Sequence, residues 1–179
     1  ATIPFVAPER LERRSGRPLL VRMGANESVF GISPVARAAM REAVDSISLY
    51  NDPESHELAV ALAEKHSVSP REIGISAGID DLLGLVVRLF VEPGDPVVTS
   101  LGSYPTFNYH VNGYGGRLEQ VPYNEDRAEL DGLLARVMET GSRLVYLANP
   151  DNPMGTWHDE AALRAFIVDL PGDCVLIHD

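Results

Sequence analysis

Short apolar runs alternate with helical segments along most of the chain, and this alternation restricts the fold more than any other feature of the sequence. The apolar runs, which predict strands, are residues 72–75, 96–99, 117–121, 144–147 and 174–177. The segments with helical spacing between them are residues 80–90, 104–112, 130–138 and 159–168. Parallel strands need long crossover connections, which are usually helices. The sequence therefore predicts an α/β fold, with a mostly parallel sheet that is covered by helices on both faces.

The beginning of the chain follows a different pattern. Residues 1–33 show no sustained periodicity and are interrupted by prolines and glycines, so they predict an irregular N-terminal arm. Ser33-Pro34 then combines an N-cap with proline at the first helical position and predicts a helix over 34–46. Asp52-Pro53 repeats this signal before a second helix. We interpret residues 34–179 as the N-terminal part of one larger domain.

Charge and composition exclude several classes of protein. The formal net charge of -11 argues against nucleic acid or an anionic membrane as a partner, because both need a basic face. No apolar stretch approaches the roughly 18 residues of a membrane helix, and the start lacks a secretory apolar run. The histidines have no metal-ligand spacing, and the single Cys174 predicts a buried, inert thiol. We expect a cytoplasmic protein without a metal.

Ligands of parallel α/β sheets bind where strands end and helices begin, so the loops after the strands carry the functional prediction. In the loop 76–81, Gly78 permits close backbone approach, and the next helix offers its first amides to a phosphate. An N-capped turn without a ligand is the alternative, and the carboxylates of Asp80 and Asp81 argue slightly against an anion. In the next loop, Tyr104 suits either stacking on a planar ligand or packing.

The turn 149–155 is the most specific of these loops, because it contains two Asn-Pro pairs. Proline fixes the backbone, so this turn can direct the amide of Asn152 at a ligand. Finally, Asp179 follows the last predicted strand, which we expect to be central and buried. A carboxylate at such a place needs a cationic partner.

These motifs resemble the fold-type-I pyridoxal-phosphate enzymes, and among them the class I/II aminotransferases of the histidinol-phosphate aminotransferase type. The family's order is an Asn-Glu pair, a tyrosine, a phosphate loop, a second tyrosine, an N-N-P-[TM]-G turn and an aspartate. This chain shows them in that order as Asn26-Glu27, Tyr50, Ser76 to Asp81, Tyr104, Asp151 to Gly155 and Asp179. The resemblance covers about residues 20–179 and implies an aminotransferase that moves an amino group between an amino acid, or an amine like histidinol phosphate, and a 2-oxo acid.

The resemblance also implies a role for each residue of the site. Asp179 would pair with the protonated ring nitrogen of pyridoxal 5'-phosphate, and Tyr104 would stack on the ring; these are the two residues to which it gives catalytic roles. Asn152 would donate a hydrogen bond to the phenolic oxygen of the cofactor. The backbone amides of Ile79 and Asp80, which follow Gly78, would hold the phosphate.

In the same family, the counterpart of Tyr50 reaches the cofactor phosphate of the neighbouring subunit, and the Asn26-Glu27 pair lies near the substrate entrance. The resemblance therefore implies a homodimer with shared active sites. Several positions depart from the family: among them, Gly102 stands where proline is common, and Ile79 stands where the residue is usually small. These departures leave the subfamily and its substrate open.

The lysine that binds the cofactor covalently in this family has no counterpart among the motifs. Lys65, the only lysine, lies in a predicted surface helix before every cofactor loop. We therefore expect that lysine, the arginine that binds the substrate carboxylate and a small C-terminal domain beyond residue 179. Other pyridoxal-phosphate chemistry, such as β-elimination, decarboxylation or oxidation, and a non-catalytic module of the same fold remain the alternatives.

Overall fold

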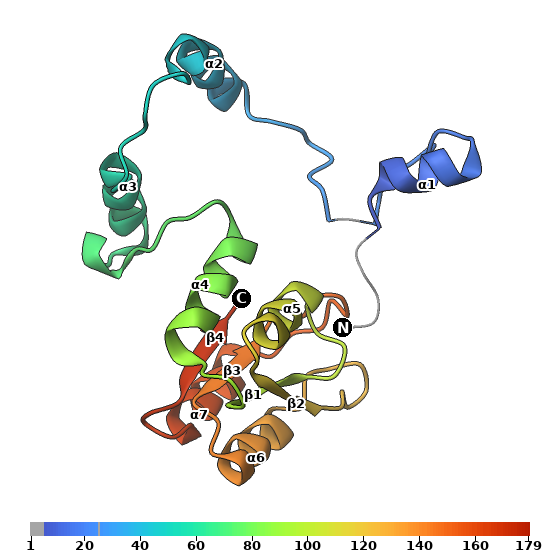
Figure 1. Cartoon of the computed structure of the whole chain (residues 1–179), viewed down its shortest axis with the longest axis vertical. Helices are drawn as coiled ribbons and strands as arrows, with labels where there is room; N and C mark the ends of the chain where they lie inside the picture. The colour runs from blue at the N-terminus through green and yellow to red at the C-terminus, as the bar shows by residue number, and fades with distance from the viewer. Residues whose placement is uncertain (1–5, 25) are drawn as a thin grey trace. The chain divides into compact units, whose positions relative to one another are not determined.

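The computed structural model describes residues 6–24 and 26–179, so residues 1–5 and 25 of the predicted arm lie outside it (Figure 1). The chain divides into two compact units, one running Pro4–Ile75 and one containing Ser76–Asp179. The sheet and the loops that follow its strands belong to the second unit.

The sheet has four strands: β1 (Pro96–Ser100), β2 (Arg117–Val121), β3 (Leu144–Leu147) and β4 (Val175–His178). They lie in the order β2-β1-β3-β4, and every neighbouring pair is parallel. The prediction of a parallel α/β fold is confirmed. The expectation that the last strand is central is wrong among the described residues, because β4 forms the edge of the sheet and is only half-buried.

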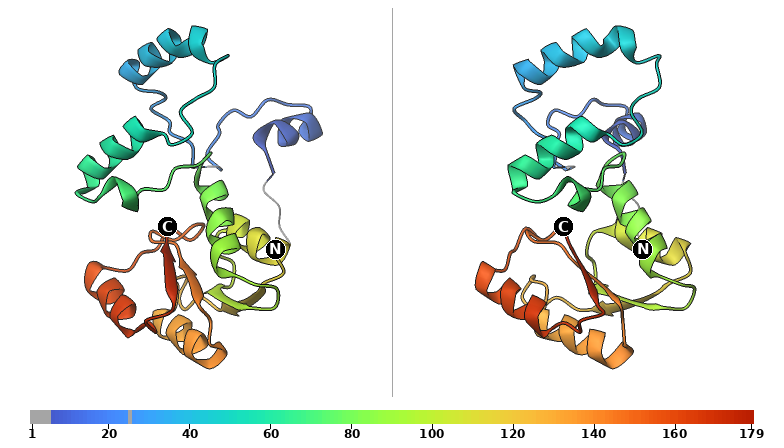
Figure 2. Two further views of the ribbon diagram at one scale, coloured as in Figure 1. Left: turned by 60° about the vertical axis from the view of Figure 1, so that its left-hand side comes forward. Right: turned by 90° about the vertical axis from the view of Figure 1, so that its left-hand side faces the viewer.

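Helices cover both faces of this sheet (Figure 2). They are α4 (Ile79–Phe90), α5 (Pro105–Gly113), α6 (Leu130–Thr140) and α7 (Glu160–Asp169). Successive residues of a strand face opposite sides. Accordingly, Tyr146 belongs to the core under α4 and α5, whereas Val145 and Leu147 belong to the core under α6 and α7.

Local signals in the sequence explain where these helices begin and end. Pro105 occupies the first turn of α5, where its missing N–H costs no hydrogen bond. The side chain of Asp159 caps α7 by accepting a hydrogen bond from the Ala162 amide at 2.8 Å. Gly141 ends α6 with φ of 64°, a left-handed conformation that glycine adopts freely.

The Pro4–Ile75 unit consists of short helices. They are α1 (Pro8–Ser15), α2 (Pro34–Ala43), η1 (Val44–Ser46), α3 (His56–His66) and η2 (Pro70–Glu72). The helix expected over 34–46 is present, as α2 continued by η1. The arm is not wholly irregular, because α1 begins with Pro8 in its first turn and ends at Gly16. The sequence of α1 is strongly polar, so no apolar periodicity predicted this helix.

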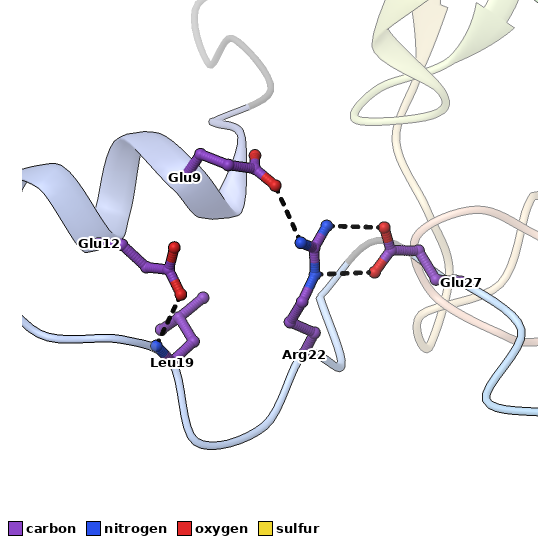
Figure 3. A network of polar contacts seen from close by, with 5 residues as sticks. All are labelled: Glu9, Glu12, Leu19, Arg22 and Glu27. Atoms are coloured by element: carbon purple, nitrogen blue, oxygen red, sulfur yellow. Dashed lines mark hydrogen bonds and ion pairs between the residues drawn. The ribbon is translucent and has the colours of Figure 1, made fainter.

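An ion pair and a hydrogen bond connect α1 to the segment that follows it, and a second ion pair lies within that segment (Figure 3). The guanidinium of Arg22 lies 2.9 Å from the Glu9 carboxylate and 2.8 Å from that of Glu27. The Glu12 carboxylate accepts a hydrogen bond from the Leu19 amide at 2.8 Å. Arg22 therefore joins α1 to the predicted substrate-binding residue Glu27, a role that no sequence pattern indicated.

The strand expected over 72–75 is absent, and this prediction was wrong. Ser69 and Glu72 form a capping box around the short 3-10 helix η2, which uses part of the segment. Residues 73–75 follow without regular structure. A run so short and flanked by a capped turn has too few residues left to join the sheet.

Candidate functional site

The order of the strands creates a place for a ligand at the carboxyl edge of the sheet. The chain passes from β1 to β2 on one side, then crosses to β3 on the other side of β1. The connections after β1 and β3 therefore diverge, and such a switch point is where ligands of open α/β sheets bind. The loop with Tyr104 follows β1, and the turn with Asn152 follows β3.

Asp179 lies at this edge and is fixed by its backbone. Its N–H donates to the carbonyl of Leu147 at 3.1 Å, and its carbonyl accepts a hydrogen bond from the Asn149 amide at 2.8 Å. These bonds continue the parallel pairing of β3 and β4 past the last paired residues. Asp179 is therefore held directly beside the start of the turn 149–155, although its side chain is exposed.

The hydroxyl of Tyr146 donates a hydrogen bond to Oδ2 of Asp179 at 2.7 Å. Tyr146 is fully buried, and its ring stacks on Phe107 with 4.5 Å between the ring centroids. Burial, followed by this hydrogen bond, raises the pKa of Tyr146, so the hydroxyl remains a donor. The residue was missed by sequence reasoning. Strand register could have found it, because Tyr146 pairs with Ile177, and Asp179 follows two residues later on the same face.

The free energy of unfolding is expected to fall above about pH 10, where an unfolded tyrosine loses its proton. Folded Tyr146 keeps its proton there, so its contribution is complete below that pH and is lost as the pH rises. The expected slope is about 1.4 kcal/mol per pH unit. Tyr146→Phe should reduce the slope of the wild type by about this amount in urea unfolding of the full-length protein between about pH 9 and about pH 11. Equal slopes for both proteins would contradict the assignment.

Tyr104 connects the loop after β1 to the start of α4. Its hydroxyl donates to Oδ1 of Asp80 at 2.8 Å, and its half-buried ring packs against the core under α4 and α5. Burial raises the pKa of Tyr104, and the negative charges of Asp80 and Asp179 contribute. The structure thus brings three predicted residues together from separate parts of the sequence.

The start of α4 has the features of an anion site. Gly78 has φ of 110° and ψ of 174°, a conformation that is essentially restricted to glycine. A Cβ built on Gly78 meets no atom within 4 Å, so the space in front of this backbone is open. The first amides of the helix, at Ile79 and Asp80, have no preceding carbonyls within the helix to bind. Together the open space and the free donors fit a phosphate group.

The acidic side chains near this start are engaged elsewhere. Asp80 accepts the hydrogen bond from Tyr104, and Oδ2 of Asp81 accepts one from the Ala77 amide at 3.4 Å. An anion at the helix start would therefore meet backbone N–H groups as its donors.

The turn after β3 is braced by its first asparagine. The Asn149 side chain donates to the carbonyl of His158 at 3.2 Å and accepts from the His158 amide at 2.7 Å. Both Asn-Pro peptide bonds of the turn are cis. Asn152 is half-buried, and its amide makes no hydrogen bond within the described part of the chain. The second asparagine is therefore available to a ligand, whereas the first has a structural role.

Two further residues of this region were missed. Asp151 is only 6% exposed, and its carboxylate accepts a hydrogen bond from the hydroxyl of Tyr123, which lies 3.1 Å from Oδ1 and 3.0 Å from Oδ2. In the sequence, Asp151 stood out only as the first residue of a motif, and no sequence pattern marked Tyr123. Nothing in the sequence showed that the segment after β2 reaches this turn.

The remaining predicted residues belong to the Pro4–Ile75 unit. Asn26 has φ of 53°, and its neighbour Glu27 pairs with Arg22. Tyr50 is fully exposed. The structure brings Asn26 and Glu27 together through the chain, but it defines no arrangement of these three residues relative to the sheet.

Several other features of the described residues lie apart from the predicted site. A hollow of about 280 Å³ lies beside the start of α6, lined by Asn124, Arg127, Ala128, Glu129, Leu130, Asp131 and His158, none of them a predicted site residue. No group of acidic, histidine or cysteine side chains suited to a metal occurs in residues 6–24 and 26–179. Within the same ranges, no helix is both long and apolar enough to span a membrane. Cys174 is half-buried, which raises its pKa to about 11.

A parallel sheet with an open helix start, an aromatic ring, an amide and a carboxylate near its carboxyl edge agrees with the fold of fold-type-I pyridoxal-phosphate enzymes. Residues 19–179 match the sequence profile of aminotransferase class I and II. The chain belongs to this family.

Relatives in the family point to one branch. A histidinol-phosphate aminotransferase of Anaeromyxobacter sp. is 35% identical over 178 residues, which cover 99% of this chain and 49% of that protein. The crystal structure of histidinol-phosphate aminotransferase from Sinorhizobium meliloti with pyridoxal-5'-phosphate is 55% identical, with a TM-score of 0.95 over 98% of this chain and 48% of that one. The aspartate aminotransferase of Rhizobium meliloti, at 22% identity and a TM-score of 0.78, shares the fold. The chain spans about half the length of the curated relatives it matches.

Proposed function

We propose that this chain is the N-terminal half of a pyridoxal-phosphate-dependent aminotransferase that acts on histidinol phosphate or a similar amine, with a 2-oxo acid as the amino acceptor. The observation that carries the proposal is the placement of Asp179, held by Tyr146 and by the backbone of Leu147 beside the turn of Asn152. The relatives of this chain that are named histidinol-phosphate aminotransferase support the choice of substrate.

Each residue of the candidate site has a physical task in this proposal. The amides of Ile79 and Asp80 bind the cofactor phosphate at the positive end of the helix dipole, and Gly78 leaves room for it. The ring of Tyr104 covers one face of the cofactor and excludes water from it. Asn152 donates its amide hydrogen to the phenolic oxygen.

Asp179 has the chemical task. Its negative charge holds a proton on the pyridine nitrogen of the cofactor, because an adjacent opposite charge favours the charged form of a titrating group. When bound, pyridoxal phosphate withdraws electrons from the α-carbon of an attached amine substrate, and the ring proton strengthens this effect. The hydroxyl of Tyr146 keeps the carboxylate oriented for this purpose.

The assembly is proposed to be a cytoplasmic homodimer. The Pro4–Ile75 unit exposes large apolar side chains that a second protein surface could cover, among them Leu20, Phe30, Ile47, Leu49 and Tyr50. In this proposal Tyr50 reaches the site of the partner subunit, and Asn26 and Glu27 lie at the substrate entrance. The lysine that binds the cofactor and the arginine that binds the substrate carboxylate are assigned to the part of the full-length protein beyond residue 179.

The test uses the full-length protein purified with pyridoxal phosphate. A visible absorption band of the lysine-bound cofactor is expected, and borohydride reduction followed by mass spectrometry should label one lysine. Histidinol phosphate with 2-oxoglutarate should then give glutamate. Absence of the band and of a labelled lysine would exclude the enzyme. A labelled lysine with α-proton exchange but no amino transfer from any donor would favour β-elimination or decarboxylation instead.

A further inference from the structure

Asp151 presents a physical problem that its family resemblance does not explain. The family motif has a neutral asparagine here, whereas this chain has an acid that is only 6% exposed. A buried carboxylate needs hydrogen-bond donors to replace water. The Met154 amide donates to Oδ1 at 3.2 Å, and the Tyr123 hydroxyl lies close to both oxygens. Tyr123 is therefore the only side-chain donor to Asp151 among the described residues.

Tyr123 is suited to this task. It lies in the segment after β2, and it is half-buried. Burial, with a further contribution from the charge of Asp151, raises the pKa of its hydroxyl, which therefore keeps its proton. A protonated hydroxyl that faces a buried carboxylate gives a hydrogen bond stronger than one between neutral groups.

The segment that carries Tyr123 lies beside the loop after β1, because the Leu101 amide of that loop donates to the Val121 carbonyl at 2.7 Å. A Cβ built on Gly102 would lie 3.6 Å from Cε2 of Tyr123, which is van der Waals distance. Gly102 has φ of 103°, a conformation that proline cannot adopt. Tyr123 therefore bonds to Asp151 and lies close to Gly102, the position of this loop that departs from the family's pattern.

We propose that Tyr123 is a positioning residue that holds the turn of Asn152 against the loop of Tyr104, so that both side chains are aimed at the cofactor. The inference rests on the proposed function, since it concerns the same site. Tyr123 acts through Asp151: its hydroxyl satisfies the buried carboxylate, and the Asp151 backbone closes the turn by donating to Thr156 and accepting from Gly155. Tyr123 itself needs no contact with substrate.

A double-mutant cycle in the full-length protein tests this proposal. Tyr123→Phe leaves the Asp151 charge without its side-chain donor and is expected to weaken cofactor binding about 10-fold. Asp151→Asn introduces the neutral residue of the family's motif, whose side chain carries no charge for Tyr123 to stabilise. The variant that carries both changes is therefore expected to bind the cofactor within about 3-fold of the wild type. Tyr114→Phe, a half-exposed tyrosine at the end of α5, is the matched control and should change nothing.

A second measurement does not depend on the cofactor. Hydrogen exchange of residues 151–156 in the cofactor-free protein should be faster in Tyr123→Phe than in the wild type, and slow again in the double variant. Unchanged affinity and exchange in Tyr123→Phe would overturn the proposal, as would a double variant that is as impaired as Tyr123→Phe. If the wild type binds no cofactor, the proposed function fails, and the exchange rates still decide whether Tyr123 holds the turn.

Discussion

Turnover by the full-length protein is expected to fall on the order of 10²- to 10³-fold when Asp179 is replaced by alanine, as typically happens when one fixed electrostatic group of an active site is removed. The loss should appear in kcat, because the charge of Asp179 is needed during the reaction and not for binding the substrate. Folding should be retained, since the contacts of Asp179 to Leu147 and Asn149 are made by the backbone, but the loss of the acceptor of the Tyr146 hydroxyl should lower the free energy of unfolding by about 1–3 kcal/mol. Steady-state kinetics and thermal unfolding measure the two effects separately.

Two companion variants separate charge from geometry. Asp179→Asn keeps an oxygen that can accept the hydrogen bond of Tyr146 but removes the charge, so it should be nearly as inactive as the alanine variant. Asp173→Ala removes an exposed acid from the turn before β4 and should leave kcat unchanged. Wild-type turnover by Asp179→Asn would show that the negative charge of Asp179 is not needed to hold a proton on the ring nitrogen.

Cofactor affinity is expected to fall about 10- to 100-fold in Gly78→Ala, since holding a non-glycine residue in this backbone region costs about 1–3 kcal/mol. The added methyl group would also enter the open space in front of the Gly78 backbone. The amides of Ile79 and Asp80 are then either displaced or shielded from the phosphate. Titration of the cofactor-free protein with pyridoxal phosphate, followed by absorption, measures the change.

Gly94→Ala is the matched control for strain. Gly94 has φ of 93° and open space where a Cβ would lie, but it precedes β1 at the opposite edge of the sheet. Both variants should therefore lose similar unfolding free energy, whereas only Gly78→Ala should lose cofactor affinity. If the two variants bound the cofactor equally well, the assignment of the cofactor phosphate to the start of α4 would be wrong.

Most of the sheet could be predicted because a buried parallel strand leaves a continuous apolar run in the sequence. The run at residues 144–147 is such a case, and all four residues are buried in β3. The run at residues 72–75 failed because Ser69 and Glu72 form a local capping box, which competes with strand formation. Helix α1 escaped because its residues are nearly all polar and only Pro8 and Gly16 mark its ends.

The residues of the candidate site likewise divide into those that the sequence could predict and those that it could not. Tyr104, Asn152 and Asp179 follow strands that were predictable, so their common edge was predictable as well, whereas Gly78 was found from the start of the helix that follows it. Tyr146 and Tyr123 could not be found from spacing, because their roles depend on which residue of another segment lies opposite. Tyr146 meets Asp179 across 33 residues and Tyr123 meets Asp151 across 28. Contacts of this kind follow from the register of the sheet, which one sequence does not state.

The switch point between β1 and β3 has a consequence for how the protein folds and is maintained. The groups assigned to the cofactor come from four stretches of chain, and those that follow β1, β3 and β4 meet only after these three strands have paired. A ligand that binds there therefore recognises the finished sheet and stabilises it by mass action over partly paired forms. Supply of the cofactor during synthesis would then act as a thermodynamic check on the assembly of the domain, because only correctly ordered strands could retain it.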